Sequence, residues 1–156
     1  MEDKTSRAAE PAGTNPTRRI LVVDDDISIR ELSTEVLIHF GYGVDTAADG
    51  AAAWQALNSD NYDLLITDHN MPELTGVELL KKLRAARMDL PVIVATGVLP
   101  KDELTQYPWL QPVVTLLKPF TIAELLGTVK EILRATDHDR EPPNRHGKPS
   151  ANGLQL

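Results

Sequence analysis

Apolar residues recur along the middle of the chain in two alternating patterns. Short runs of branched apolar residues, such as Leu64-Leu65-Ile66, are typical of strands that are buried on both faces of a sheet. Between these runs, apolar residues recur at three- and four-residue spacing, which indicates amphipathic helices. The runs predict strands over 20–23, 42–47, 64–68, 91–95 and 113–117, and the spacings predict helices over 29–40, 50–59, 77–83 and 122–133, with a short additional helix over 101–107.

Residues at the ends of these segments support the assignment. Gly41 follows the first helix, where a glycine in the left-handed conformation ends many helices. Thr121 and Glu124 form the capping-box pattern that begins a helix, and Pro91 stands at the start of a strand, where sheets tolerate proline. A strand followed by a helix, five times over, predicts an α/β fold: a doubly wound parallel sheet with helices on both faces.

The two ends of the chain lack this pattern. Residues 1–18 are polar and contain Pro11, Gly13 and Pro16, and residues 136–156 contain three prolines and two glycines but almost no large apolar residue before Leu154. Such segments cannot bury enough apolar surface to offset the entropy of ordering. We therefore expect a disordered leader over 1–18, one folded domain over 19–135 and a disordered tail over 136–156.

Composition excludes several classes of protein. The chain has 156 residues, of which 42% are hydrophobic and 25% charged, as in ordinary globular domains. Its net charge of −7 argues against nonspecific binding of nucleic acid, which needs a basic face. There is no cysteine, so thiol nucleophiles and cysteine-bound zinc are excluded. No apolar run is long enough to insert into a membrane and no secretory signal is present, so we expect a cytoplasmic protein.

Four of the predicted strands end in side chains that carry a charge or a hydroxyl group. These side chains are Asp24 and Asp25 after the first strand, Asp68 at the end of the third, Thr96 after the fourth and Lys118 after the fifth. Parallel strands bring their carboxyl ends to one edge of the sheet, which is where open α/β sheets bind ligands. We therefore expect these five residues to converge.

Their chemistry indicates a site for phosphoryl groups. Three carboxylates in one place repel, by about 4 kcal/mol per pair at ~4 Å and an effective dielectric constant of ~20, and they stay ionised when a cation joins them. Oxygen ligands without His or Cys favour Mg²⁺. Lys118 would add a point charge and Thr96 a hydroxyl donor, and a carboxylate at such a site can act as nucleophile and form an aspartyl phosphate.

Each residue also has a simpler interpretation. The aspartates after the first strand are suited to cap a helix, Asp68 to begin a turn, and Lys118 to be a surface charge. His69 follows Asp68 and is within reach of the site, although a solvated loop histidine is the simpler interpretation. We favour the phosphoryl site because the simpler interpretations would all have to hold together, at the same ends of successive strands.

At this point the residues resemble a known family, the receiver domain of bacterial response regulators in two-component systems, over residues 19–134. The resemblance rests on four motifs in order. These are the first strand with its acidic pair (residues 20–26), the segment Ile66-Thr67-Asp68-His69-Asn70-Met71-Pro72 with its continuation to Gly76, the hydroxyl turn Thr96-Gly97, and the pair Lys118-Pro119. The resemblance implies a flavodoxin-like (βα)5 sheet with strand order 2-1-3-4-5.

The resemblance also implies a role for each site residue. Asp68 would accept a phosphoryl group from a phosphohistidine of a sensor histidine kinase or phosphotransfer protein. Asp25, Asp68 and the backbone carbonyl of Asn70 would bind Mg²⁺ directly, with Asp24 acting largely through water. Lys118 and Thr96 would bind the phosphoryl oxygens, and the bond between Lys118 and Pro119 is expected to be cis.

Two positions depart from the family pattern. Thr115 stands three residues before the lysine, where most members carry an aromatic residue that reports phosphorylation, so Tyr107 and Trp109 are alternative candidates for that role. Val98 stands two residues after Thr96. We hypothesise that this apolar group hinders an attacking water and prolongs the phosphorylated state.

The leading functional hypothesis is a phosphorylation-activated signalling module whose output goes through a protein partner, because about twenty tail residues cannot form a DNA-binding helix-turn-helix. Its only catalysis would be its own phosphoryl transfer and hydrolysis. The alternative is an interaction module with the same fold that works without phosphorylation. A metal-dependent phosphatase is disfavoured, because such enzymes need a second aspartate where this chain has Asn70.

Overall fold

Five parallel strands form a single sheet in the order β2-β1-β3-β4-β5. The structure is a computed structural model that describes residues 17–98, 104 and 106–140. The predicted leader and tail therefore lie largely outside the described residues. The strands are β1 (Arg19–Val23), β2 (Gly43–Ala47), β3 (Leu64–Asp68), β4 (Val92–Thr96) and β5 (Val113–Leu117). The predicted flavodoxin-like fold class and strand order are confirmed.

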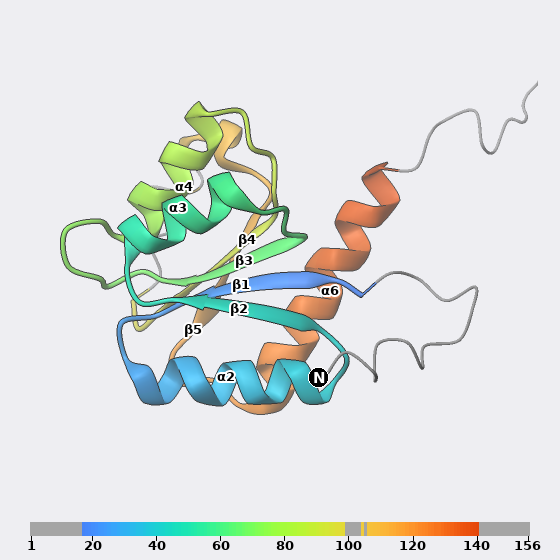
Figure 1. The fold of residues 1–156 in the computed structure, drawn as a ribbon. Helices are drawn as coiled ribbons and strands as arrows, with labels where there is room; N and C mark the ends of the chain where they lie inside the picture. Colours follow the sequence, from blue (N-terminus) through green and yellow to red (C-terminus); the bar gives the residue numbers. More distant parts are fainter. Residues whose placement is uncertain (1–16, 99–103, 105, 141–156) are drawn as a thin grey trace, which may run out of the picture.

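Helices cover both faces of the sheet (Figure 1). One face carries α2 (Ile27–His39) and α6 (Ile122–Arg140), and the other carries α3 (Gly50–Ser59) and α4 (Gly76–Ala85). A short 3-10 helix, η1 (Pro108–Leu110), precedes β5. The helix predicted over 101–107 falls largely outside the described residues. None of the described helices combines the length and apolar character needed to cross a bilayer.

Alternate residues of each strand face the two helical layers. In β1, Leu21 and Val23 belong to the core cluster beneath α3 and α4, whereas Ile20 and Val22 belong to the cluster beneath α2 and α6. Every residue of β3 and β4 is buried, because helices cover both faces of these strands and other strands flank both edges. This burial explains their continuous apolar sequences, and it makes the polar residue that ends β3 stand out.

Three local features predicted from the sequence are confirmed. Gly41, which follows the C-cap residue Phe40 of α2, has a φ of +99°. The side chains of Thr121 and Glu124 form a reciprocal capping box at the start of α6. The peptide bond between Lys118 and Pro119 is cis.

The last helix is longer than the apolar spacing predicts. It runs to Arg140, whereas the pattern ends the folded part at Ala135. Thr136 is buried, and its hydroxyl donates to helix carbonyls one turn earlier. Asp137 forms an ion pair with Arg18, which the composition had assigned to the leader. Arg18 and Thr136 lie just outside the predicted limits of the folded domain, and both have partners in this structure.

A buried arginine ties α4 to the segment before β5. Nε of Arg84 donates to the carbonyl of Leu110 (2.9 Å), Nη1 to that of Met88 (2.7 Å) and Nη2 to that of Pro112 (2.9 Å). Burial lowers the pKa of Arg84 to about 10, opposed by the charge of Asp89. The sequence gives no sign of this contact, because a charged residue in a helix normally indicates its solvated face.

Candidate functional site

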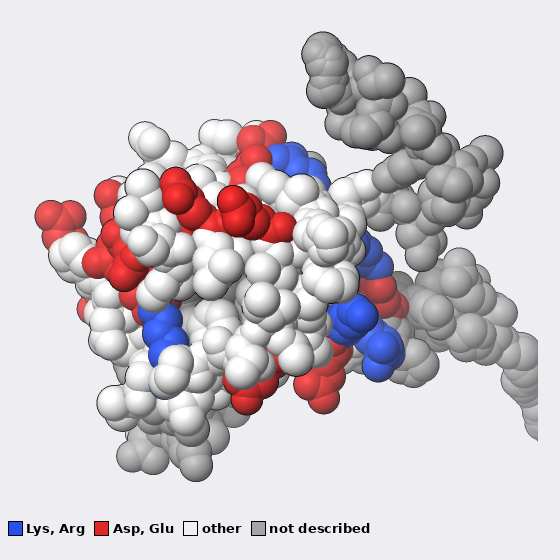
Figure 2. Space-filling view, turned by 90° about the horizontal axis from the view of Figure 1, so that it is seen from below, with Lys and Arg blue, Asp and Glu red and all other residues white. Residues whose placement is uncertain are grey.

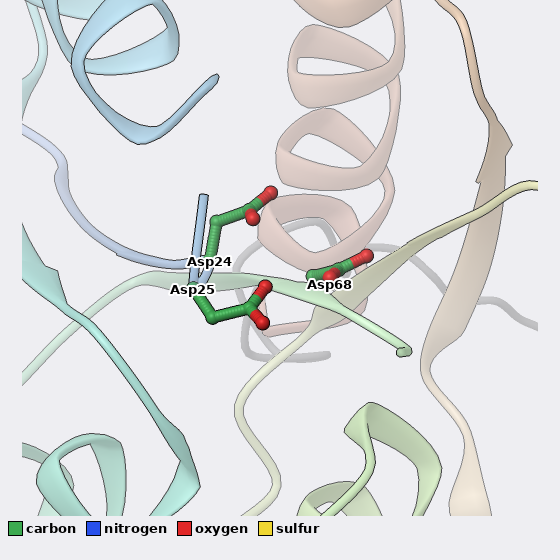
Figure 3. A group of neighbouring side chains, drawn as sticks. All are labelled: Asp24, Asp25 and Asp68. Atoms are coloured by element: carbon green, nitrogen blue, oxygen red, sulfur yellow. The ribbon is translucent and has the colours of Figure 1, made fainter. Parts of the chain in front are cut away.

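Three carboxylates meet where β1 and β3 end. One carboxylate oxygen from each of Asp24, Asp25 and Asp68 lies within 4.8 Å of the other two, and the three side chains lie close together (Figure 3). Asp24 and Asp68 are each only 5% exposed, whereas Asp25 is exposed to solvent. The parallel register of β1 and β3 produces this convergence, because it pairs Val23 with Thr67 and so places Asp24 beside Asp68, the last residue of β3.

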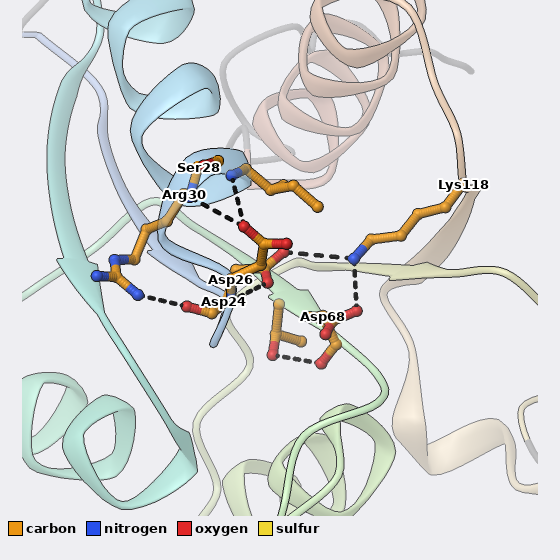
Figure 4. A network of polar contacts seen from close by, with 8 residues as sticks. Asp24, Asp26, Ser28, Arg30, Asp68 and Lys118 are labelled. Atoms are coloured by element: carbon orange, nitrogen blue, oxygen red, sulfur yellow. Dashed lines mark hydrogen bonds and ion pairs between the residues drawn. The ribbon is translucent and has the colours of Figure 1, made fainter.

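Lys118 reaches this group from the end of β5. Its Nζ lies 2.9 Å from Oδ1 of Asp68 and 3.4 Å from Oδ2 of Asp24, and so bridges two of the carboxylates (Figure 4). Burial acts to lower the pKa of the Lys118 ammonium, but the hydrogen bond to Asp68 and the charges of both aspartates raise it above its ordinary value. Lys118 is therefore a fixed positive charge at neutral pH.

The pKa of Asp24 lies above its ordinary value, chiefly because the carboxyl group is buried. Burial and the charge of Asp68 raise the pKa of Asp24, while the backbone N–H of Asp26 and the ammonium of Lys118 oppose the rise. Among the described residues, three carboxylates share one ammonium here. Their donor atoms are all oxygens, one side is open through Asp25, and the set therefore fits a hard divalent cation such as Mg²⁺.

Among the described residues, no side-chain hydrogen bond joins the other two predicted residues, Thr96 and Asn70, to this group. Thr96 ends β4 and is buried, but its hydroxyl donates to the carbonyl of Val98 (2.8 Å) and accepts from the Val98 N–H (3.2 Å). Asn70 lies exposed in the loop after β3. The structure thus brings Asp24, Asp25, Asp68 and Lys118 together, and it shows Thr96 bonded within its own turn.

The loop after Asp68 is held closely against α4. The carbonyl of His69 accepts hydrogen bonds from the N–H groups of Met71 and Gly76, each at 3.0 Å, and its ring Nδ1 accepts from the Val77 N–H at 3.4 Å. His69 therefore contacts the start of α4, and among the described residues no hydrogen bond joins its side chain to the carboxylate group. Gly76 lies so close to the end of β3 that a Cβ there would stand 2.5 Å from the carbonyl oxygen of Asp68.

Two residues that shape the site were missed in the sequence. The motif after Asp68 contains Gly76 but indicates no role for it, and Arg30 lies outside every motif. Nη1 of Arg30 donates to the carbonyl of Asp24 at 2.7 Å. A sequence signal exists for Arg30, since a residue one turn into α2 can reach back to the strand end. It is too general to single out one arginine.

Comparisons with known proteins agree with this geometry. Residues 20–130 match the model of the response regulator receiver domain. Response regulator MprA of Mycobacterium avium (strain 104) is 39% identical over 121 residues, which are 76% of this chain and 52% of that protein. The chain therefore spans about half the length of the curated relatives that it matches.

Solved structures show the same likeness. The chemotaxis response regulator CheY4 of Vibrio cholerae is 32% identical with a TM-score of 0.69, and the match covers 75% of this chain and 99% of that one. The response regulator TrrA of Thermotoga maritima, solved in complex with Mg²⁺ and BeF, is 36% identical with a TM-score of 0.65, over 74% of this chain and 99% of that one. The family match, the sequence identity and the shared fold together establish that this chain belongs to the response regulator receiver domain family.

Proposed function

We propose that this chain is a phosphorylation-activated signalling module in which Asp68 is the phosphoacceptor. The observation that carries the proposal is the position of the Asp68 carboxylate, which is held at 2.9 Å by Lys118 within a group of three carboxylates at the end of a buried strand. The phosphoryl donor would be a phosphohistidine on a sensor histidine kinase or a phosphotransfer protein, as the family membership suggests.

The residues present fit a magnesium ion. Asp24, Asp25, Asp68 and the backbone carbonyl of Asn70 would hold it, and all of them offer the oxygen ligands that Mg²⁺ prefers. When bound, the ion would neutralise charge on the phosphoryl oxygens. The structure of TrrA with Mg²⁺ and BeF supports this assignment by analogy.

The chain's own residues divide the remaining work. A carboxylate oxygen of Asp68 forms the new bond to phosphorus, while the bond from phosphorus to the histidine nitrogen breaks and the imidazole keeps the electron pair. Lys118 stays protonated because its two carboxylate neighbours raise its pKa, so it can stabilise negative charge on the phosphoryl oxygens. Thr96 takes part once its hydroxyl leaves the Val98 carbonyl and turns toward the phosphoryl group.

The output is proposed to go through a protein partner in the cytoplasm, without nucleic acid. Viewed from the side on which α2 lies, Lys and Arg side chains form small, separate groups among acidic ones (Figure 2), and the whole chain carries a net charge of −7. Thr115 replaces the usual aromatic residue. Tyr107, which precedes η1, is 37% exposed, and Trp109, within η1, is 50% exposed. These two aromatic side chains are our candidates for reporting the phosphorylated state.

Transfer of radiolabelled phosphoryl groups from acetyl phosphate tests the proposal. We expect incorporation in the presence of Mg²⁺ and none when EDTA removes it. The control variant Asp60→Asn, at an exposed position after α3, should incorporate label like the unaltered protein. Absence of label under all conditions would instead support an interaction module that works without phosphorylation.

A further inference from the structure

Arg30 connects α2 to the acidic pair that follows β1. It lies in the first turns of α2, and its guanidinium turns back toward the strand end (Figure 4). Its Nη1 donates to the carbonyl oxygen of Asp24 at 2.7 Å. This carbonyl belongs to the peptide unit that joins Asp24 to Asp25, so Arg30 holds the backbone between two of the three carboxylates.

The rest of this loop is fixed at Asp24 and Asp26, but not at Asp25. The N–H of Asp24 donates to the carbonyl of Ala47 (3.2 Å), and the carboxylate of Asp24 accepts from the N–H of Asp26 (2.9 Å). Asp26 in turn caps α2 by accepting from the N–H of Ser28 (2.9 Å). Asp25 is exposed, and among the described residues its side chain has no hydrogen bond or ion pair. Since no partner of its own orients the Asp25 side chain, the backbone sets the direction from which its carboxylate extends.

We propose that Arg30 is a positioning residue that aims Asp25 into the metal site by fixing the peptide unit between Asp24 and Asp25. This inference rests on the proposed function. A peptide unit is planar, so holding its oxygen restricts rotation of the whole unit and sets the direction in which the Asp25 side chain leaves the backbone. Arginine suits this task because its donors form a rigid planar group that stays charged at physiological pH.

If Arg30 positions Asp25, its removal should weaken Mg²⁺ binding. If Arg30 acts only through its positive charge, its removal should strengthen Mg²⁺ binding. The guanidinium is a cation near a cation site, so its charge alone repels Mg²⁺ and its loss should tighten binding. Loss of positioning should weaken binding, because residues that orient metal ligands typically contribute 10- to 100-fold in affinity. The contact of Arg30 is with a backbone carbonyl rather than a carboxylate, so we expect the positioning effect to dominate.

Titration calorimetry with Mg²⁺ alone tests the inference. The variants are Arg30→Met and Arg30→Gln, which both favour helices and should leave α2 formed, with Arg134→Met at an exposed position of α6 as the matched control. We expect about 10-fold weaker Mg²⁺ binding in both Arg30 variants and no change in the control. At saturating Mg²⁺ the rate of phosphorylation by acetyl phosphate should return to near the unaltered value. Arg30→Lys, which keeps a charged donor, should bind Mg²⁺ better than Arg30→Met.

Other outcomes would contradict either the positioning role of Arg30 alone or the proposed function as well. Unchanged or tighter Mg²⁺ binding in folded Arg30→Met and Arg30→Gln overturns the positioning role alone. So does a phosphorylation rate that stays low at saturating Mg²⁺, because Arg30 would then act on the phosphoryl group itself. If the unaltered protein neither binds Mg²⁺ nor accepts a phosphoryl group, the proposed function fails and the role of Arg30 fails with it.

Discussion

Replacing Gly76 by alanine should displace Asp68, although Gly76 is not itself one of the site residues. Gly76 is the first residue of α4, and its N–H donates to the carbonyl of His69. A Cβ at this position would stand 2.5 Å from the carbonyl oxygen of Asp68 and 3.0 Å from Cα of His69. Both neighbours are backbone atoms, so no side-chain rotation can relieve the overlap. The start of α4 and the end of β3 must move apart.

The size of the effect follows from these distances. A carbon and a carbonyl oxygen normally approach no closer than about 3.3 Å, so the backbones must separate by roughly 0.8 Å. Overpacking of this kind costs about 1–3 kcal/mol of the free energy of unfolding, and the better helix propensity of alanine offsets at most about 1 kcal/mol. A displacement of the reacting carboxylate by close to 1 Å can slow a reaction by about 100-fold. We therefore expect a net loss of about 0–2 kcal/mol in stability after the full offset, and a much larger relative loss in phosphorylation rate.

Urea unfolding and the rate of phosphorylation by acetyl phosphate measure both effects. Gly127→Ala is the matched control, because Gly127 is an exposed residue of α6 with no atom within 4 Å of its added Cβ. That variant should gain up to about 1 kcal/mol and keep its phosphorylation rate. A Gly76→Ala variant as stable and as fast as the unaltered protein would refute the argument that close backbone contact positions Asp68.

Four further predictions concern single side chains. Lys118→Met should slow phosphorylation by acetyl phosphate about 100-fold while the fold persists, and an unchanged rate would exclude Lys118 from charge stabilisation. Arg84→Met should lower the free energy of unfolding in urea by about 2–3 kcal/mol, because three carbonyls lose their donor, and a change below about 0.5 kcal/mol would contradict this. Burial and a hydrogen bond to Asp45 raise the pKa of Tyr62 from 10.0 to about 12, so the unfolded chain loses this proton first and stability should fall as pH rises from 10 to 12. In Tyr62→Phe the free energy of unfolding should decrease less between these pH values. If urea unfolding gave the same pH profile for this variant and the unaltered protein, Tyr62 would not be the cause of the decrease. Val98→Glu should speed loss of the phosphoryl group from the phosphorylated protein, because Val98 is 78% exposed beside the hydroxyl turn. If this variant and the unaltered protein lost the phosphoryl group at the same rate, Val98 would not hinder the attacking water.

Most of the fold was predictable because its signals are local. The buried run Leu64-Leu65-Ile66 and the cap at Gly41 each depend on a few neighbouring residues, and the strand–helix alternation follows from them. The extension of α6 to Arg140 was not predictable, because it coincides with contacts such as the ion pair from Asp137 to Arg18, which lie far apart in the sequence.

The candidate site likewise has some features that were predictable from the sequence and others that were not. The convergence of Asp24, Asp25, Asp68 and Lys118 was predictable, because parallel strands must place their carboxyl ends at one edge. The hydroxyl of Thr96 was placed correctly at a strand end, but its bonds to Val98 depend on rotation about one side-chain torsion. The roles of Gly76 and Arg30 depend on tertiary approach to backbone atoms, and no pattern of residue types records such distances.

Intact-protein mass spectrometry after incubation with acetyl phosphate and Mg²⁺ shows whether Asp68 is the acid that takes up phosphorus. We expect a gain of one phosphoryl group in the unaltered protein and in Asp60→Asn, and no gain in Asp68→Asn. A phosphoryl group retained by Asp68→Asn, or a mass that never changes in the unaltered protein, would exclude Asp68 as the phosphoacceptor.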